Sequence, residues 1–190
     1  MIPTPPRPAA HSQDNTASAT TETVRSPAAT LHFLWLELTG RCPLTCTHCY
    51  AASSPTGSHG TMTDNDWRSV IDQAAALNVS MVQFIGGEPT AHPHFASLLR
   101  HAISSGLAAE VYTNLLHVKD TLWDLFACPG VSLATSYYSD SPQQHDAITL
   151  RPGSHAKTRA NITEAIRRGI PLRAGIISLE CPEASGQSIH

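Results

Sequence analysis

Three cysteines lie within eight residues of one another, Cys42, Cys46 and Cys49, in the stretch LTGRCPLTCTHCYA. Cysteine thiolates are the usual protein ligands of iron–sulfur clusters and also bind zinc. A cubane [4Fe-4S] cluster normally takes one thiolate per iron, so three thiolates leave one iron open to a small molecule. The short spacings let a single loop surround such a cluster without a costly loop closure. The pattern therefore predicts an iron–sulfur site whose fourth ligand is a substrate or cofactor.

A structural zinc site is the main alternative for this loop. Such sites are usually closed by four protein ligands. His48 is poorly placed as the fourth, because its neighbour Cys49 would already bind the metal, but His59 or Cys181 could act as a remote ligand. Cys181 and the other isolated cysteine, Cys128, are otherwise expected to have structural or incidental roles.

Alternating apolar runs and amphipathic stretches surround these cysteines. Helices are predicted over residues 61–78, where Thr63 and Asp66 form a capping-box pattern, from Phe95 to a stop at Gly106, and over residues 118–127 and 154–168. Apolar runs predict buried strands at residues 31–38, 80–85, 109–114, 131–138 and 170–178. Strands that alternate with helices indicate a parallel α/β sheet.

Two polar motifs directly follow predicted strands. The cysteine loop comes after the first strand, and Gly86-Gly87-Glu88-Pro89 ends the second. Ligands bind at the carboxyl edge of parallel sheets and barrels, so both motifs are expected on one functional edge. Trp35, Trp67 and Trp123 are expected to pack in the core or between strands and helices.

Composition limits the remaining function classes. The chain has 190 residues, of which 41% are hydrophobic, and this suits one domain with a sizeable core. A net charge of -3 gives no broad cationic surface for nucleic acid or an anionic membrane, and no apolar run is long enough to cross a bilayer. Residues 1–29 are rich in Pro, Ala, Ser and Thr and predict a disordered leader without a secretory signal, which favours a cytoplasmic protein.

The motifs together resemble those of the radical S-adenosylmethionine (SAM) enzymes. The spacing Cys42-x-x-x-Cys46-x-x-Cys49 looks like their cluster motif, and GGEP looks like their SAM amino-group motif. YTN at Tyr112–Asn114 and SYYSDSPQQHDAI at Ser136–Ile148 are similar to the ends of the family's third and fourth strands. The resemblance covers roughly residues 31–178.

The resemblance implies a cofactor pair and a set of binding residues. A [4Fe-4S] cluster on the three cysteines would cleave SAM reductively to a 5′-deoxyadenosyl radical, with an electron from a reductant protein. Glu88 would bond the SAM ammonium, and His48 would lie near adenine, where the family usually has an aromatic residue. The full set of implied SAM-binding residues is His48, Gly86, Gly87, Glu88, Pro89, Thr113, Asn114 and Ser136. Arg151 is a further candidate polar contact.

The family's partial (β/α) TIM-like barrel has six strands, and only five are found here. We therefore expect a radical SAM core at residues 30–178, truncated after about five strands, and an irregular tail at 179–190. The sequence most resembles peptide maturases of the SPASM type without their cysteine-rich C-terminal domain, which implies a ribosomally made peptide as substrate. The alternative is a non-catalytic iron–sulfur or zinc protein, or a partner subunit.

Overall fold

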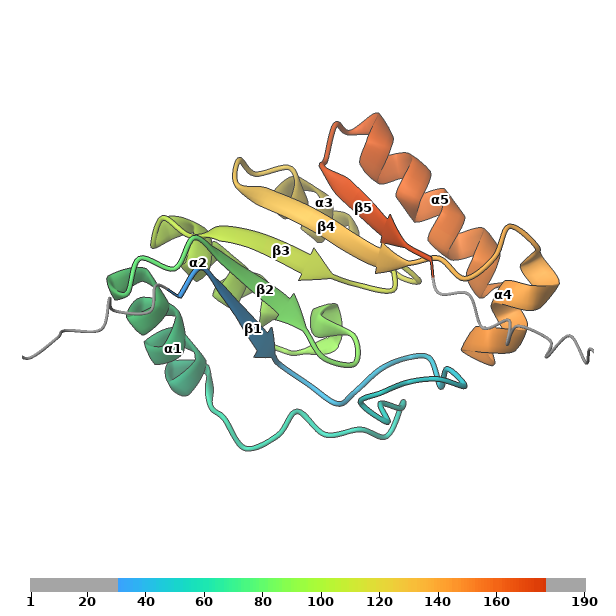
Figure 1. The fold of residues 1–190 in the computed structure, drawn as a ribbon, viewed down its shortest axis with the longest axis horizontal. Helices are drawn as coiled ribbons and strands as arrows, with labels where there is room; N and C mark the ends of the chain where they lie inside the picture. Colours follow the sequence, from blue (N-terminus) through green and yellow to red (C-terminus); the bar gives the residue numbers. More distant parts are fainter. Residues whose placement is uncertain (1–30, 177–190) are drawn as a thin grey trace, which may run out of the picture.

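The computed structural model describes residues 31–176, which form a single open parallel sheet with helices against it (Figure 1). The strand order is β1-β2-β3-β4-β5, and every neighbouring pair is parallel. The strands are β1 Phe33–Glu37, β2 Met81–Ile85, β3 Ala108–Tyr112, β4 Val131–Ser136 and β5 Leu172–Gly175. This unclosed five-stranded α/β sheet confirms the expected partial barrel.

Helices connect consecutive strands, as parallel pairing requires. Their bounds are α1 Asp64–Ala76, the 3₁₀ helix η1 Pro89–Ala91, α2 Phe95–Ser104, α3 Asp120–Phe126, α4 Pro142–Thr149 and α5 Ser154–Arg167. The Thr63–Asp66 capping box is confirmed, because the Thr63 hydroxyl accepts from the Asp66 N–H while the Asp66 carboxylate accepts from the Thr63 N–H. Gly106 has a positive φ of 81° just after α2, as its predicted role at a helix end requires.

One face of the sheet carries the hydrophobic core. Alternate strand residues such as Leu36, Phe84, Val111 and Leu133 are almost fully buried and lie in register across the sheet. They belong to the same apolar cluster as buried residues of α1, α2, α3 and α5. The alternation of side chains along a strand sends the other half of the residues to the opposite face, which these helices leave uncovered.

The uncovered face carries a group of polar side chains on β2 to β5. Glu110 of β3 accepts two hydrogen bonds from the Arg173 guanidinium of β5, each 2.8 Å long, and also contacts the amide of Gln83. The arginine holds the pKa of Glu110 below its ordinary value. The Tyr112 hydroxyl lies 3.0 Å from the Ser136 hydroxyl at the carboxyl ends of β3 and β4. A polar open face next to the cysteine loop is suited to a ligand rather than to another layer of core.

The first strand differs from its prediction. Residues 31–38 were expected to be a buried strand, but Trp35 is 62% exposed and Phe33 is 40% exposed. Both side chains lie on the helix-free face of β1, so the core placement of Trp35 is wrong. Trp67 and Trp123 are buried as predicted.

The structure also contains a helix that the sequence reasoning missed. Residues 142–149 form α4, between β4 and α5. Its start is marked by Ser141, whose hydroxyl accepts from the Gln144 N–H, and by Pro142 at the first helical position. Both are helix-start signals that could have located it.

None of the helices between residues 31 and 176 combines the length and apolarity needed to cross a membrane. The predicted leader at 1–29 and the tail at 179–190, with Cys181, lie outside the described residues.

Candidate functional site

The cysteine loop leaves β1 and folds back on itself. The Gly40 N–H donates to the Ser58 carbonyl and the Cys42 N–H to the Ser54 carbonyl, each at 2.9 Å. These main-chain bonds close the loop. The main chain of the loop therefore has a defined path.

The second anchor of the loop is α4 and the turn that follows it. The Thr47 N–H, between two of the cysteines, donates to the Ile148 carbonyl at 2.9 Å. The Arg151 guanidinium donates to the Pro43 carbonyl at 3.0 Å. Arg151, considered above as a polar contact to cofactor, is thus engaged in holding the loop. Thus α4, which the sequence reasoning missed, helps to position the cysteine loop, which the same reasoning had identified.

Two of the three thiols, those of Cys42 and Cys49, have hydrogen-bond donors that suit thiolate ligands. Cys42 is buried, and its sulfur accepts from the Leu44 N–H at 3.4 Å and from the Asn114 amide at 3.6 Å. The Cys49 sulfur accepts from the Ser53 N–H at 3.4 Å. Such donors stabilise sulfur that carries negative charge.

Burial works against thiolate formation in the metal-free loop. It raises the pKa of Cys42 to about 11 and also raises the pKa of Cys46. A bound cation would offset this cost, because cysteines bind metals in the deprotonated state. With all three thiols free on one loop, the residues present fit an iron–sulfur cluster.

Among residues 31–176, no three Cys, His, Asp or Glu side chains converge as ligands of a single metal ion. Cluster cysteines bind separate irons and have no need to meet at one point. His59, the candidate remote zinc ligand, is bonded to the Thr39 hydroxyl at 2.9 Å and packs its ring on His92. Cys128 lies against the main core, away from this loop, with its thiol 3.5 Å from the Asp124 carbonyl.

The glycine turn after β2 packs directly on the chain leading into the cysteine loop. A Cβ atom on Gly86 would lie 2.4 Å from the Thr39 carbonyl oxygen, and one on Gly87 would lie 2.5 Å from that of Arg41. Gly86 also has a φ of +129°, which side chains disfavour. In the protein the glycines admit the backbone of residues 39–41, with the Glu88 N–H donating to the Arg41 carbonyl.

Glu88 joins the ends of two strands. Its fully buried carboxylate accepts from the Thr113 hydroxyl at 2.8 Å, from the Asn114 N–H at 2.8 Å, and from the Thr90 hydroxyl at 2.7 Å. Burial raises its pKa, while these hydrogen bonds lower it. Pro89 is buried at the first position of η1. Four predicted residues, Glu88, Pro89, Thr113 and Asn114, thus lie together at the carboxyl edge.

Replacing Glu88 by glutamine is expected to destabilise the fold by about 1–3 kcal/mol, the usual cost of an unsatisfied buried polar group. Whichever way the amide is turned, its NH₂ would face donors that now point at a carboxylate oxygen. The check is the urea unfolding midpoint of the metal-free protein. Glu37→Gln, at an exposed carboxylate of β1, is the matched control and should leave the midpoint unchanged. An equal midpoint for both variants would contradict the argument.

The remaining two predicted residues are His48, within the cysteine loop, and Ser136, at the end of β4. The imidazole of His48 meets the ring of Tyr138 edge to face, with 4.9 Å between centroids, and its buried Nδ1 has no partner among the described residues. Ser136 ends β4 and is bonded to Tyr112. Tyr138, which sequence reasoning did not single out, supplies the aromatic surface beside His48. The unpartnered Nδ1 offers a polar contact to a ligand in this position.

Comparison with known proteins identifies the family to which this chain belongs. Residues 36–179, most of the chain, match the family described as the radical SAM superfamily. The chain belongs to the radical SAM superfamily. This confirms the family resemblance, the [4Fe-4S] cluster and SAM as its cofactors, and the partial-barrel fold class.

Curated relatives of this radical SAM chain are PqqA peptide cyclases. That of Ruegeria pomeroyi is 34% identical over 154 residues, covering 79% of this chain and 39% of the relative. That of Rhodopseudomonas palustris is 37% identical over 137 residues, covering 72% of this chain and 35% of the relative. The chain thus spans less than two fifths of the length of either of these relatives.

Solved structures share the fold of this radical SAM chain at low identity. Streptococcus suis SuiB bound to S-adenosylmethionine gives a TM-score of 0.70 at 18% identity, covering 80% of this chain and 35% of that one. A histidine-tagged anSMEcpe with bound AdoMet gives 0.63 at 16% identity, covering 76% and 42%. A likeness at this identity concerns the arrangement of strands and helices.

Proposed function

We propose that the chain is the core of an enzyme that cleaves SAM reductively and modifies a peptide. The single observation that carries this proposal is the junction of the cysteine loop with the GGEP turn, where main-chain bonds join residues 39–41 to Gly87 and Glu88. When bound, the [4Fe-4S] cluster and SAM supply a 5′-deoxyadenosyl radical that abstracts a hydrogen atom. The protein's part is to position this chemistry and shield it from water.

Each motif has a distinct part in that positioning. Cys42, Cys46 and Cys49 hold three irons, and the donors to the sulfurs of Cys42 and Cys49 fix the orientation of those ligands. The glycine turn and the strand-end residues Thr113 and Asn114 border the ligand at the carboxyl edge. Glu88 acts mainly by locking these strand ends together, since its oxygens already accept bonds from protein donors.

His48, Tyr138 and Ser136 form the opposite wall of the proposed SAM site. The two rings, packed edge to face, offer an adenine an aromatic face on which to stack, and the His48 Nδ1 gives it a polar partner. The Ser136 hydroxyl, already bonded to Tyr112, is placed for a sugar or carboxylate oxygen. This division assigns the methionine end to the GGEP side and the nucleoside end to the His48 side.

A peptide substrate is supported by the relatives. Those named above are PqqA peptide cyclases, and a further structural neighbour is SuiB bound to its precursor peptide SuiA, with a TM-score of 0.71 at 17% identity. The polar helix-free face with Glu110 and Arg173 provides an open surface next to the cysteine loop on which an extended chain could lie. The peptide's sequence and a reductant protein as electron source are parts of the same proposal.

The test is anaerobic reconstitution with iron and sulfide, followed by reduction and an assay for 5′-deoxyadenosine. We expect about four irons per chain and conversion of SAM to methionine and 5′-deoxyadenosine. A cluster that forms without SAM cleavage would favour the non-catalytic alternative for this chain. A protein that takes up zinc instead of a cluster would overturn the proposal.

A further inference from the structure

A groove with cationic walls runs beside the cysteine loop. It consists of two adjoining pockets of about 460 and 480 Å³ that share His117 and Lys119. Arg41 and Arg151 line the first pocket, and Lys157 lines the second. We call these five residues and the space between them the basic groove.

The charge of the basic groove is concentrated and unpaired. Lys119 and Lys157 are the only lysines in the 190-residue sequence, and the chain as a whole carries a net charge of -3. The ion pairs found among residues 31–176 use other basic side chains, which are Arg68, Arg167, Arg168, Arg173, His94, His101 and His145. No carboxylate in this part of the chain forms an ion pair with the groove, so it presents a positive field to solvent.

Two further residues, Glu88 and His117, bear on the electrostatics of the groove. The one carboxylate in its described lining is that of Glu88, which is buried and already accepts bonds from Thr113 and Asn114. The pKa of His117 is lowered by burial and by the charges of Lys157 and Arg151. An imidazole that resists protonation beside two cations is consistent with a local excess of positive charge.

The groove lies on the helix-covered side of the sheet and reaches the first cysteine. Its walls include Thr90–Pro93 before α2, the start of α3, and Ala160 and Asn161 of α5, all elements that pack on the apolar face or extend from it. Cys42 and Pro43 form part of the same wall. The groove therefore approaches the proposed cluster from a side different from the helix-free face with Glu110 and Arg173.

We propose that the basic groove is the docking surface for an acidic electron-donor protein. This rests on the proposed function, because it requires a cluster at Cys42. The donor's acidic side chains would enter the groove, bringing its redox group close to the cluster ligand without blocking the open face. One electron passes from the donor's reduced cofactor to the cluster, so the donor is oxidised by one electron and no bond or proton moves.

A protein donor suits the groove better than a peptide substrate does. The substrate must reach the radical, which forms where SAM lies, and the first pocket adjoins the proposed SAM site at Glu88 and Asn114. In the described part of the chain, the end of the groove that holds Lys157 is lined by no cysteine and no residue of the GGEP turn. An electron donor only has to come near the cluster. Complementary charge also raises the rate at which two proteins associate, by about tenfold or more at low salt.

The test compares two reductants of the reconstituted full chain by stopped-flow spectroscopy. One is reduced flavodoxin, a small acidic one-electron donor, and the other is photoreduced 5-deazariboflavin, which is small and uncharged. In the Lys119→Glu/Lys157→Glu variant we expect the flavodoxin rate constant to fall by about tenfold or more and to lose its salt dependence. The deazariboflavin rate should not change.

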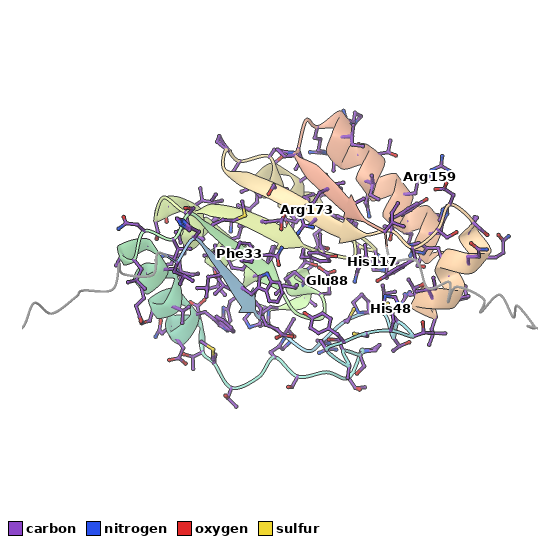
Figure 2. All side chains as sticks on the ribbon, viewed as in Figure 1. Phe33, His48, Glu88, His117, Arg159 and Arg173 are labelled. Carbon is purple, nitrogen blue, oxygen red and sulfur yellow. The ribbon has the colours of Figure 1, made fainter. Side chains whose placement is uncertain are left out.

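Arg159→Glu is the matched control, because it reverses a charge on the same helix as Lys157 without lining the groove; Figure 2 shows Arg159 apart from His117. It should keep the wild-type flavodoxin rate. Equal flavodoxin rates in all three proteins would overturn the proposal, as would slower reduction of the lysine variant by deazariboflavin. Hexaglutamate serves as a model acidic peptide. If the Lys119→Glu/Lys157→Glu variant lost hexaglutamate binding but kept the wild-type flavodoxin rate, the groove would be reassigned to a peptide. Wild-type protein that cannot cleave SAM after deazariboflavin reduction would instead refute the proposed function.

Discussion

Replacing Cys42, Cys46 or Cys49 by alanine should each time abolish the cluster. With two thiolates left, two of the four irons lack a protein ligand, and no other cysteine among residues 31–176 lies on the loop to replace the lost one. Iron and sulfide per chain after anaerobic reconstitution should fall from about four to nearly zero.

Cys128→Ala is the control for this experiment. Its thiol lies at the edge of the main core, with the Asp124 carbonyl as its neighbour, and the variant should keep its full iron content. Loss of the cluster from Cys128→Ala would refute the three-ligand assignment. A loop variant that still holds four irons would do the same.

The second large effect is expected from Gly86→Ala, which should destabilise the metal-free protein by about 3 kcal/mol. A Cβ atom there lies 2.4 Å from the Thr39 carbonyl oxygen, so the backbone must shift, and overpacking of this kind costs about 1–3 kcal/mol. The φ of +129° adds strain of similar size. Urea unfolding measures the loss.

Gly130→Ala separates the two causes. Gly130 has a φ of +85° but open space around its Cβ position, so alanine there introduces backbone strain of about 1–2 kcal/mol without a clash. Because Thr39 leads into the cysteine loop, Gly86→Ala should also reduce iron uptake, whereas Gly130→Ala should not. Equal unfolding midpoints for the two variants would show that the close packing of the turn on residues 39–41 contributes little.

Both predictions concern the contact between the cysteine loop and the glycine turn. The cysteine loop is held from one side by the glycine turn and from the other by α4 and Arg151. A substitution in the turn therefore acts on the cluster through the backbone of residues 39–41. This distinguishes it from a cysteine substitution, which removes a ligand and should leave the fold intact.

The sequence by itself determined the sheet, most of its helices and the residues of the proposed cofactor site. Apolar runs interrupted by helix caps and glycines are local signals, and the Thr63–Asp66 box and Gly106 mark helix ends as predicted. The cysteine spacing is equally local, because one loop must supply all three ligands. For this reason the motifs could be assigned to the carboxyl edge of the sheet before any contact between them was known.

Only the tertiary structure decided what surrounds those residues. The exposure of Trp35 depends on which face of the sheet the helices cover, and a strand's own pattern does not specify that face when both are apolar in sequence. The bonds from Glu88 to Thr113 and Asn114 join strand ends that are 25 and 26 residues apart in sequence. Likewise, Lys119 and Lys157 meet Arg41 and Arg151 in one groove only because parallel strands bring the segments that follow each strand to the same edge. Long-range pairing creates such contacts, and the spacing of residues along the chain does not encode them.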